Sequence, residues 1–307
     1  MKRANAWLLV RISAIMCLPF VSPPLAMPYE ETTVTNGGTI RGKVIVTGKK
    51  PTPTAFNLVT FPNAEYCGRI STGTGWRLLK DFVIAPDGGL KDVVVMIRDI
   101  SRGKPFDVTP QKIEARDCQF LPFVTVVRNQ HKVTVVNMDP VIHDIQAYQT
   151  SERGPRVLFN MPLTMNPFHK QSGVLQSQEH KPGEPVVETI HLDQGRNIFF
   201  MQCGFHAYMQ SWGIAGENPY YAITGEDGAF ILPDVPDGEY TLVAWHEGVR
   251  MLQQQVSIEA NKKTVMVNFE FQAPTGRRND MVEHPHFGLE AQGKPLIIQP
   301  TLERQEP

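Results

Sequence analysis

The sequence predicts an all-β protein built from two β-sandwiches, and three observations lead to this fold class. Short runs rich in valine, isoleucine and threonine recur along the chain, at residues 39–46, 92–97, 124–127 and 132–136. Glycine, proline and aspartate separate these runs, which is typical of turns between strands. The chain has 307 residues, enough for two β-domains that each bury a core.

The charge balance excludes one class of partner. Lys and Arg number 30 against 31 for Asp and Glu, and the sequence pI is about 6.8. Binding to DNA or RNA relies on an excess of basic side chains that neutralise phosphates. We therefore expect no nucleic-acid partner.

The N-terminus resembles an export signal. Lys2 and Arg3 precede an apolar stretch that ends near Val21. Arg11 and Pro19 interrupt this stretch, which falls short of the roughly 20 residues that a membrane span needs. We expect cleavage after residue 26, no membrane span afterwards, and a periplasmic or otherwise extracytoplasmic location.

The pattern of runs and turns divides the chain into five expected parts. Residues 148–187 are rich in Pro, Met, Gln and Gly without a strand period, and we interpret them as a surface insertion in the first sandwich. The expected parts are a signal (1–26), an N-terminal β segment (27–75), a first sandwich (76–216), a second sandwich (217–272) and an extended tail (273–307).

Four side chains in the first sandwich form a candidate metal site. Cys203, His206 and Met209 share one short loop directly after the apolar run 197–201. A sandwich brings neighbouring strand ends together, so His143, which follows the run 132–136, is the expected second imidazole. Two imidazoles and a thiolate in one plane with a weak axial thioether are typical of type 1 copper.

The cysteine count agrees with this site. Cys67, Cys118 and Cys203 remain once Cys17 leaves with the signal, which is an odd number for an exported protein. If Cys203 is a metal-bound thiolate, Cys67 and Cys118 are left to form a disulfide. Zinc is the alternative metal, because it accepts the same thiolate and imidazoles, but the thioether of Met209 favours copper.

These residues resemble the cupredoxins, in particular plastocyanin- and amicyanin-like proteins of the methylamine-utilisation type. The Asn137–His143 stretch is similar to their first-histidine loop, and Cys-x2-His-x2-Met at Cys203, His206 and Met209 is similar to the contracted ligand loop of amicyanins. The resemblance implies a cupredoxin-like Greek-key sandwich. Asp144 stands where many cupredoxins have an asparagine that ties the ligand loops together, which implies a weaker tie, because an ionised carboxylate cannot donate.

The second sandwich carries a different resemblance. Its pattern Gly-x-Phe followed by Val-Pro-x-Gly-x-Tyr, at Gly228–Phe230 and Val235–Tyr240, is similar to carboxypeptidase regulatory-like (transthyretin-like) modules. Turns are expected at Asp227-Gly228 and at Pro236-Asp237-Gly238. The resemblance implies a smaller sandwich with a structural or binding role.

Together these features predict an exported type 1 copper protein that transfers electrons to or from a redox protein partner through the edge of His206. The alternative is a non-redox copper-binding protein, such as a chaperone, or a structural subunit of an extracytoplasmic assembly. We expect no enzyme: hydrolase motifs are missing, and an oxidase subunit would need the repeated His-x-His pairs that the sequence lacks.

Other residues suggest sites but have simpler interpretations. Met161, Met165 and His169 suggest a second Cu(I) site, although methionines more often pack over an apolar patch. His246 follows the strand residue Trp245 and is expected to be a loop or core histidine. Phe205 and Tyr208 suggest an apolar collar for docking around His206, or simple packing of the loop. His284 and His286 in the tail are expected to lie at the surface.

Overall fold

The computed structural model describes residues 29–68, 75–150, 155–171, 180–259 and 264–274. The expected signal and most of the expected tail, with His284 and His286, lie outside these residues. Within them, no helix has the length and apolar character to span a membrane. Strands dominate, and the predicted all-β fold class of two β-sandwiches is confirmed.

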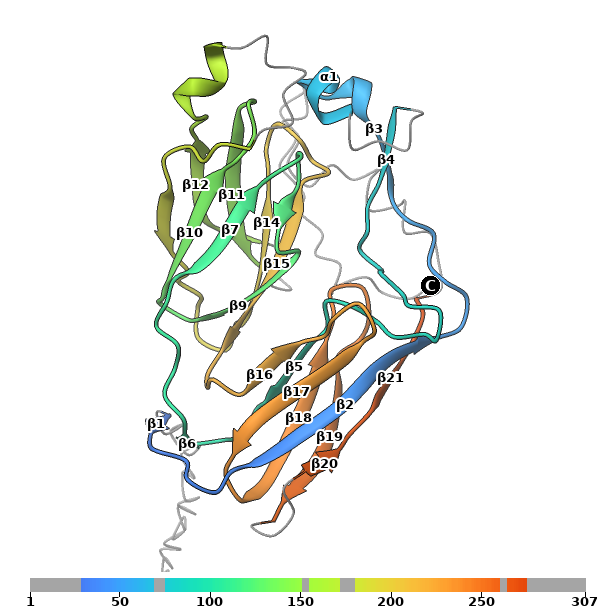
Figure 1. The fold of residues 1–307 in the computed structure, drawn as a ribbon, viewed down its shortest axis with the longest axis vertical. Coiled ribbons are helices and arrows are strands. Elements are labelled where there is room, and N and C mark those ends of the chain that lie inside the picture. The colour runs from blue at the N-terminus through green and yellow to red at the C-terminus, as the bar shows by residue number, and fades with distance from the viewer. Residues whose placement is uncertain (1–28, 69–74, 151–154, 172–179, 260–263, 275–307) are drawn as a thin grey trace, which may run out of the picture.

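The first sandwich, in the upper half of Figure 1, has a four-stranded and a five-stranded sheet. The four-stranded sheet contains β13 (Val186–Thr189), β10 (Lys132–Asn137), β7 (Gln111–Ala115) and β8 (Phe120–Leu121), in that order. The five-stranded sheet contains β12 (Arg156–Leu163), β11 (His143–Gln149), β14 (Ile198–Gln202), β15 (Gln210–Gly216) and β9 (Val124–Arg128). Parallel pairs β7–β10 and β9–β15 lie among antiparallel pairs, so the chain crosses between the two sheets.

The second sandwich, in the lower half of Figure 1, is discontinuous in sequence. One sheet contains β16 (Tyr221–Ile223), β5 (Val94–Ile97), β18 (Gly238–Trp245) and β19 (Leu252–Ile258). The other is formed by β17 (Ala229–Val235), β2 (Gly38–Thr47), β20 (Thr264–Met266) and β21 (Phe269–Gln272). The first sandwich is therefore inserted between β5 and β16.

This pairing differs from the expected boundaries. β2 falls in the expected N-terminal segment and β5 in the expected first sandwich, yet both pair with strands that follow residue 217. The reason is physical: β5 pairs with β16 on one side and β18 on the other, and hydrogen bonds of this kind connect strands that are distant in sequence. A change of composition along the chain does not reveal them.

The expected insertion is also partly strand. β12 pairs antiparallel with β11 from His143↔Leu163 to Gln149↔Arg156, across one register irregularity. β12 is an edge strand that contains a proline, Pro162, and only its second half, from Phe159 to Leu163, alternates in burial. The predicted absence of strand structure in residues 148–187 is thus wrong for 148–149, 156–163 and 186–187.

Both faces of β14, the central strand of the five-stranded sheet, are buried. On β14, Phe199 and Met201 enter the core of the first sandwich, whereas Ile198 and Phe200 face a separate apolar cluster. That cluster includes Val94 of β5 and Trp245 of β18, so it is the interface between the two sandwiches. A strand buried on both faces is expected to be apolar throughout, and every residue of β14 except Gln202 is apolar.

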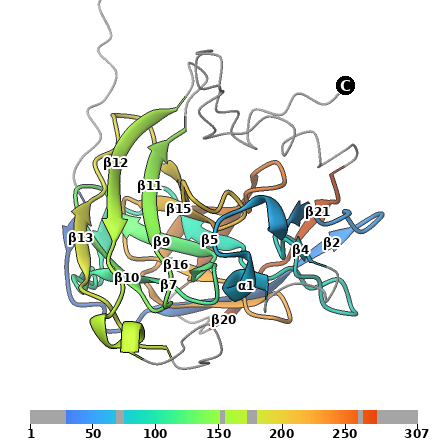
Figure 2. The ribbon, with the colours of Figure 1, turned by 90° about the horizontal axis from the view of Figure 1, so that it is seen from above.

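A short segment before the first sandwich covers one of its ends. It comprises β3 (Ala55–Asn57), the 3-10 helix η1 (Leu58–Thr60) and helix α1 (Ala64–Cys67), and we call residues 55–67 the cap segment. β3 pairs with β4 (Trp76–Leu78), and Figures 1 and 2 show α1 beside the ends of the first sandwich strands. The remaining elements are the β1 (Glu30–Glu31) and β6 (Arg102–Gly103) pair and the 3-10 helix η3 (Pro167–Gln171).

Candidate metal centre

Two neighbouring strands bring the four predicted ligands to one end of the first sandwich. His143 is the first residue of β11, while the loop from Cys203 to Met209 connects the end of β14 to the start of β15. β11 and β14 are antiparallel, with Gln146 opposite Gln202. The start of β11 therefore lies beside the end of β14.

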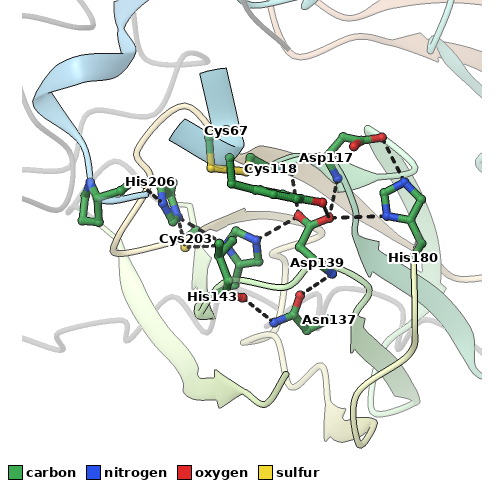
Figure 3. The surroundings of a disulfide bond; sticks show 12 residues. Cys67, Asp117, Cys118, Asn137, Asp139, His143, His180, Cys203 and His206 are labelled. Carbon is green, nitrogen blue, oxygen red and sulfur yellow. Dashed lines mark hydrogen bonds and ion pairs between the residues drawn. A yellow bond between two sulfur atoms is a disulfide. The ribbon is translucent and has the colours of Figure 1, made fainter. Parts of the chain in front are cut away.

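Three ligand atoms converge there, as Figure 3 shows. Nδ1 of His143 lies 3.2 Å from Nδ1 of His206. Sγ of Cys203 lies 3.5 Å from Nδ1 of His206 and 3.9 Å from Nδ1 of His143. All three side chains are fully buried, and Cys203 is the free cysteine of the described residues.

The size of this triangle suits a transition metal. A point in its plane that is equidistant from the three atoms lies about 2.1 Å from each of them, close to the roughly 2.0–2.3 Å of metal–imidazole and metal–thiolate bonds to zinc. Two imidazoles and one thiolate are also the in-plane donors of type 1 copper sites. The residues present therefore fit a copper ion.

Met209 belongs to the same loop and is fully buried. The loop is compact: the amide of Cys203 donates to the carbonyl of Met209 (3.1 Å), and the amide of Met209 donates to the carbonyl of His206 (2.8 Å). These bonds keep Met209 in the core cluster that also contains Cys203. The backbone therefore holds Met209, the fourth predicted ligand, in the same buried loop as Cys203 and His206.

The outer nitrogen of each imidazole has an oxygen partner. Nε2 of His206 donates to the carbonyl of Pro62 at 3.0 Å, and Nε2 of His143 lies 3.0 Å from Oδ2 of Asp139. A carbonyl only accepts, so the hydrogen of neutral His206 is on Nε2. When both rings carry their hydrogen on Nε2, both Nδ1 lone pairs point to the same place, an arrangement that a cation stabilises.

The electrostatics of the free site favour uncharged ligands. Burial raises the pKa of the Cys203 thiol to about 12, although the backbone N–H groups of Asp144 and Phe205 act in the opposite direction. Burial, followed by the nearby His143, lowers the pKa of His206 to about 4. A bound cation would offset the cost of forming a thiolate in this buried position.

Asp144 links the two ligand loops even though it is not an asparagine. Its Oδ1 accepts a hydrogen bond from the amide of Gly204 at 2.5 Å, and Oδ2 accepts one from Nε2 of Gln146 at 3.0 Å. The weaker tie expected from the sequence is therefore not what the structure shows. An acceptor is sufficient here because the partner on the other loop is a backbone donor.

The expected solvent edge at His206 is wrong. His206 is fully buried, because the cap segment lies over it and Pro62 occupies its outer nitrogen. Tyr208 is also buried and packs against Phe56 and Phe61 of the cap segment, with ring centroids 6.0 and 5.1 Å away. Phe205, which is 46% exposed, is the aromatic residue of this loop that reaches solvent.

The predicted disulfide joins the cap segment to the sandwich. Cys67 and Cys118 are bonded, with Cα atoms 5.6 Å apart. Sequence reasoning did not single out Pro62 or Asp139. Asp139 lies inside the Asn137–His143 loop and was visible as a possible partner of His143, whereas nothing in the sequence relates Pro62 to His206.

The other suggested sites follow their simpler interpretations. Nε2 of buried His169 faces the backbone of Lys181, and Met161 packs against the first core. His246 is buried in the second sandwich, where its ring lies 4.7 Å from that of Phe82 and its Nδ1 accepts from the amide of Gly248.

A comparison with protein families matches residues 207–266 to domain II of polysaccharide lyase family 4. This match begins in the ligand loop and ends with β20. It is a different family from the carboxypeptidase regulatory-like modules that the sequence pattern resembles. No curated protein sequence is significantly similar to the chain.

The solved structures similar to this chain include cupredoxins. A purple cupredoxin from Nitrosopumilus maritimus is 18% identical over 34% of this chain and 99% of its own, with a TM-score of 0.25. A copper-containing nitrite reductase from Thermus scotoductus is 18% identical over 38% of this chain and 24% of its own, with a TM-score of 0.25. Amicyanin from Paracoccus versutus is 11% identical over 40% of this chain and 97% of its own, also with a TM-score of 0.25. These low scores do not support a functional assignment.

Proposed function

We propose that this chain is a type 1 copper protein that transfers electrons to or from a redox protein partner. The observation that carries the proposal is the triangle of His143 Nδ1, His206 Nδ1 and Cys203 Sγ, with sides of 3.2, 3.5 and 3.9 Å. A bound copper ion would supply one-electron chemistry, alternating between Cu(I) and Cu(II). The chain itself supplies the geometry.

The site is built to change little between two oxidation states. The three residues that would hold the ion, His143, Cys203 and His206, are fully buried, and each imidazole is held from outside by Asp139 or Pro62. Asp144 holds the ligand loop at Gly204. Side chains that are fixed in this way exclude water and reorganise little, which favours electron transfer.

Burial also distinguishes a carrier from a copper chaperone. A chaperone hands over its ion by ligand exchange, so an acceptor must reach at least one ligand. Here His143, Cys203 and His206 are all inaccessible, and the cap segment would have to move first. The geometry therefore favours an ion that stays in place.

We infer an extracytoplasmic location as well. The disulfide between Cys67 and Cys118 suits an oxidising compartment, and the N-terminal sequence resembles an export signal. Electron exchange with a protein partner would occur there.

The decisive experiment loads the purified protein with copper and records its visible absorption and EPR spectra. We expect an intense thiolate-to-copper band and the narrow hyperfine splitting of a copper–thiolate site. Cys203→Ser should abolish both signals, because it removes the thiolate. As a control, Met266→Leu alters a side chain that is 66% exposed on β20 and should leave the spectrum unchanged.

Two outcomes would contradict the proposal. Tight binding of zinc with no thiolate-to-copper band in the wild-type protein would indicate a zinc site. Rapid transfer of copper from the folded protein to a small chelator would instead support the chaperone alternative.

A further inference from the structure

Asp139 lies behind the candidate ligand His143 and is itself fully buried. Its Oδ2 is 3.0 Å from Nε2 of His143. A buried carboxylate is costly unless donors surround it. A fully buried Asp139 therefore needs several hydrogen-bond donors.

Donors reach both carboxylate oxygens. The hydroxyl of Tyr66 and the amide of Asp117 donate to Oδ1 at 2.9 and 2.7 Å. The amide of Cys118 donates to Oδ2 at 2.8 Å. Two backbone N–H groups and a hydroxyl donate to the carboxyl group of Asp139, which stabilises its ionised form, so the hydrogen shared with His143 is assigned to Nε2 of the imidazole.

The donors are held by the disulfide. Tyr66 and Asp117 each precede one of its two cysteines, and Cys118 is itself one of them (Figure 3). Asp139 is fixed from its own loop too, because its amide donates to Oδ1 of Asn137 at 2.9 Å. Besides His143 and Tyr66, two titratable groups face Asp139: Nδ1 of His180 lies 3.7 Å from Oδ1, and a carboxylate oxygen of Asp117 lies within 4.8 Å of the Asp139 carboxylate.

The two imidazoles thus have different outer partners. His206 donates to a neutral carbonyl, whereas His143 donates to an anion. A carboxylate partner fixes the tautomer and ring orientation of an imidazole ligand and makes it more basic. A more basic ligand stabilises the more highly charged metal ion.

We propose that Asp139 is a positioning residue, whose carboxylate fixes Nδ1 of His143 as the ligand atom and favours the oxidised ion, lowering the reduction potential. This rests on the proposed function, because it assigns a role at the same metal site. Asp139 acts through His143 and does not itself bind the ion.

The first test uses the wild-type protein. Long-range ¹H–¹⁵N NMR of the metal-free and Zn(II)-loaded protein should show the hydrogen of His143 on Nε2 in both states. A hydrogen on Nδ1 of His143 in the metal-free state would overturn the proposal. This measurement does not need copper or redox activity, so it also decides the proposal if the protein is not a copper carrier.

The second test uses variants. Asp139→Asn should raise the reduction potential of the copper-loaded protein and weaken Zn(II) binding roughly 10- to 100-fold. Tyr66→Phe removes one donor to Asp139, leaves the carboxylate a stronger acceptor for His143, and should lower the potential. Asp117→Asn is the control, because it removes a nearby carboxylate that contacts His180 rather than His143, and its shift should be smaller.

The sign of the shifts separates this role from a general loss of structure. Folded Asp139→Asn with the potential and zinc affinity of the wild type would overturn the proposal, as would shifts of the same sign in Asp139→Asn and Tyr66→Phe. If Asp139→Asn does not fold, Tyr66→Phe and the NMR measurement decide. The wild-type protein could lack a copper–thiolate band and still carry the hydrogen of His143 on Nε2. This pair of results would contradict the proposed function but would leave the contact between His143 and Asp139 established.

Discussion

The two sandwiches have the same architecture but fill their cores differently. The second core contains apolar side chains such as Ile40, Leu90 and Phe269, and the second sandwich also buries single polar residues such as Asn218 and His246. The first core ends in a group of buried polar residues formed by Asn137, Asp139, His143, Cys203 and His206. In the described part of the chain, the clusters that could hold a metal ion all lie in the first sandwich.

This difference indicates that the buried polar residues of the candidate metal site lower the stability of the first sandwich. Buried imidazoles and carboxylates lose hydration, and their hydrogen bonds recover only part of that cost. The first sandwich has a disulfide and a cap segment at the same end. We infer that these features compensate for the polar cluster of the first sandwich, whereas the buried polar residues of the second sandwich form no metal-binding cluster in the described part of the chain.

The largest expected effect tests whether the two sandwiches depend on each other. Trp245 is fully buried in their interface, with its ring centroid 6.5 Å from that of Trp212. Trp245→Ala should lower the free energy of unfolding by about 3–5 kcal/mol, measured by urea titration. Ile231→Ala, at a 50% exposed position of β17, should cost about 1 kcal/mol or less. Equal effects would show that the interface contributes little.

The next prediction concerns the disulfide that only the first sandwich has among the described residues. Cys67 and Cys118 are 51 residues apart, and closing such a loop restricts the unfolded chain by about 4 kcal/mol. The double variant Cys67→Ala/Cys118→Ala should lose about this much in urea unfolding. Wild-type protein with a reductant should behave in the same way. A loss well under about 1 kcal/mol would contradict the compensating role.

A matched pair of asparagines sharpens the comparison. Nδ2 of Asn137 donates to the carbonyl of Val141 at 2.9 Å, and Nδ2 of Asn218 donates to the carbonyl of Ile97 at 2.7 Å. Each also accepts from the amide two residues later. Asn137→Ala and Asn218→Ala should each cost about 1–3 kcal/mol in thermal unfolding. Only Asn137→Ala should weaken Zn(II) binding, measured by competition with a chelator, because Asn137 lies in the His143 loop.

The smallest effect on stability is expected at Met209. Met209→Leu conserves volume and should cost under about 1.5 kcal/mol in urea unfolding. Loss of the thioether should raise the reduction potential of the copper-loaded protein, measured by redox titration, because an axial donor stabilises the oxidised ion. An unchanged potential in Met209→Leu would indicate that the thioether is not a ligand.

Much of the fold was predictable because it is local. The runs at 39–46, 92–97, 124–127 and 132–136 correspond to β2, β5, β9 and β10. Tyr240 shows how the predicted turn before β18 is secured, since its hydroxyl donates to the carbonyls of Pro236 and Asp237. Edge strand β12 was not predicted, because it contains a proline and only its second half, from Phe159 to Leu163, alternates between buried or half-buried and exposed residues.

The ligand set was predictable for a similar reason. Three of its members share one loop, and the chemistry of thiolate, imidazole and thioether limits the choice of metal. His143 lies at the adjacent strand end, as sandwich geometry requires. The burial of His206 was not predictable, because the carbonyl of Pro62 approaches from 144 residues away and a backbone carbonyl has no sequence signature.

The sequence by itself determined the runs that form β2, β5, β9 and β10, the turn before β18, the donor set of the candidate site and the pairing of Cys67 with Cys118, because each follows from local pattern or residue chemistry. Only the tertiary structure decided which strands belong to which sandwich, that the cap segment closes the edge of His206, and that Asp139 lies behind His143. These depend on backbone hydrogen bonds and burial between segments that are distant in sequence, and neither composition nor spacing encodes such contacts.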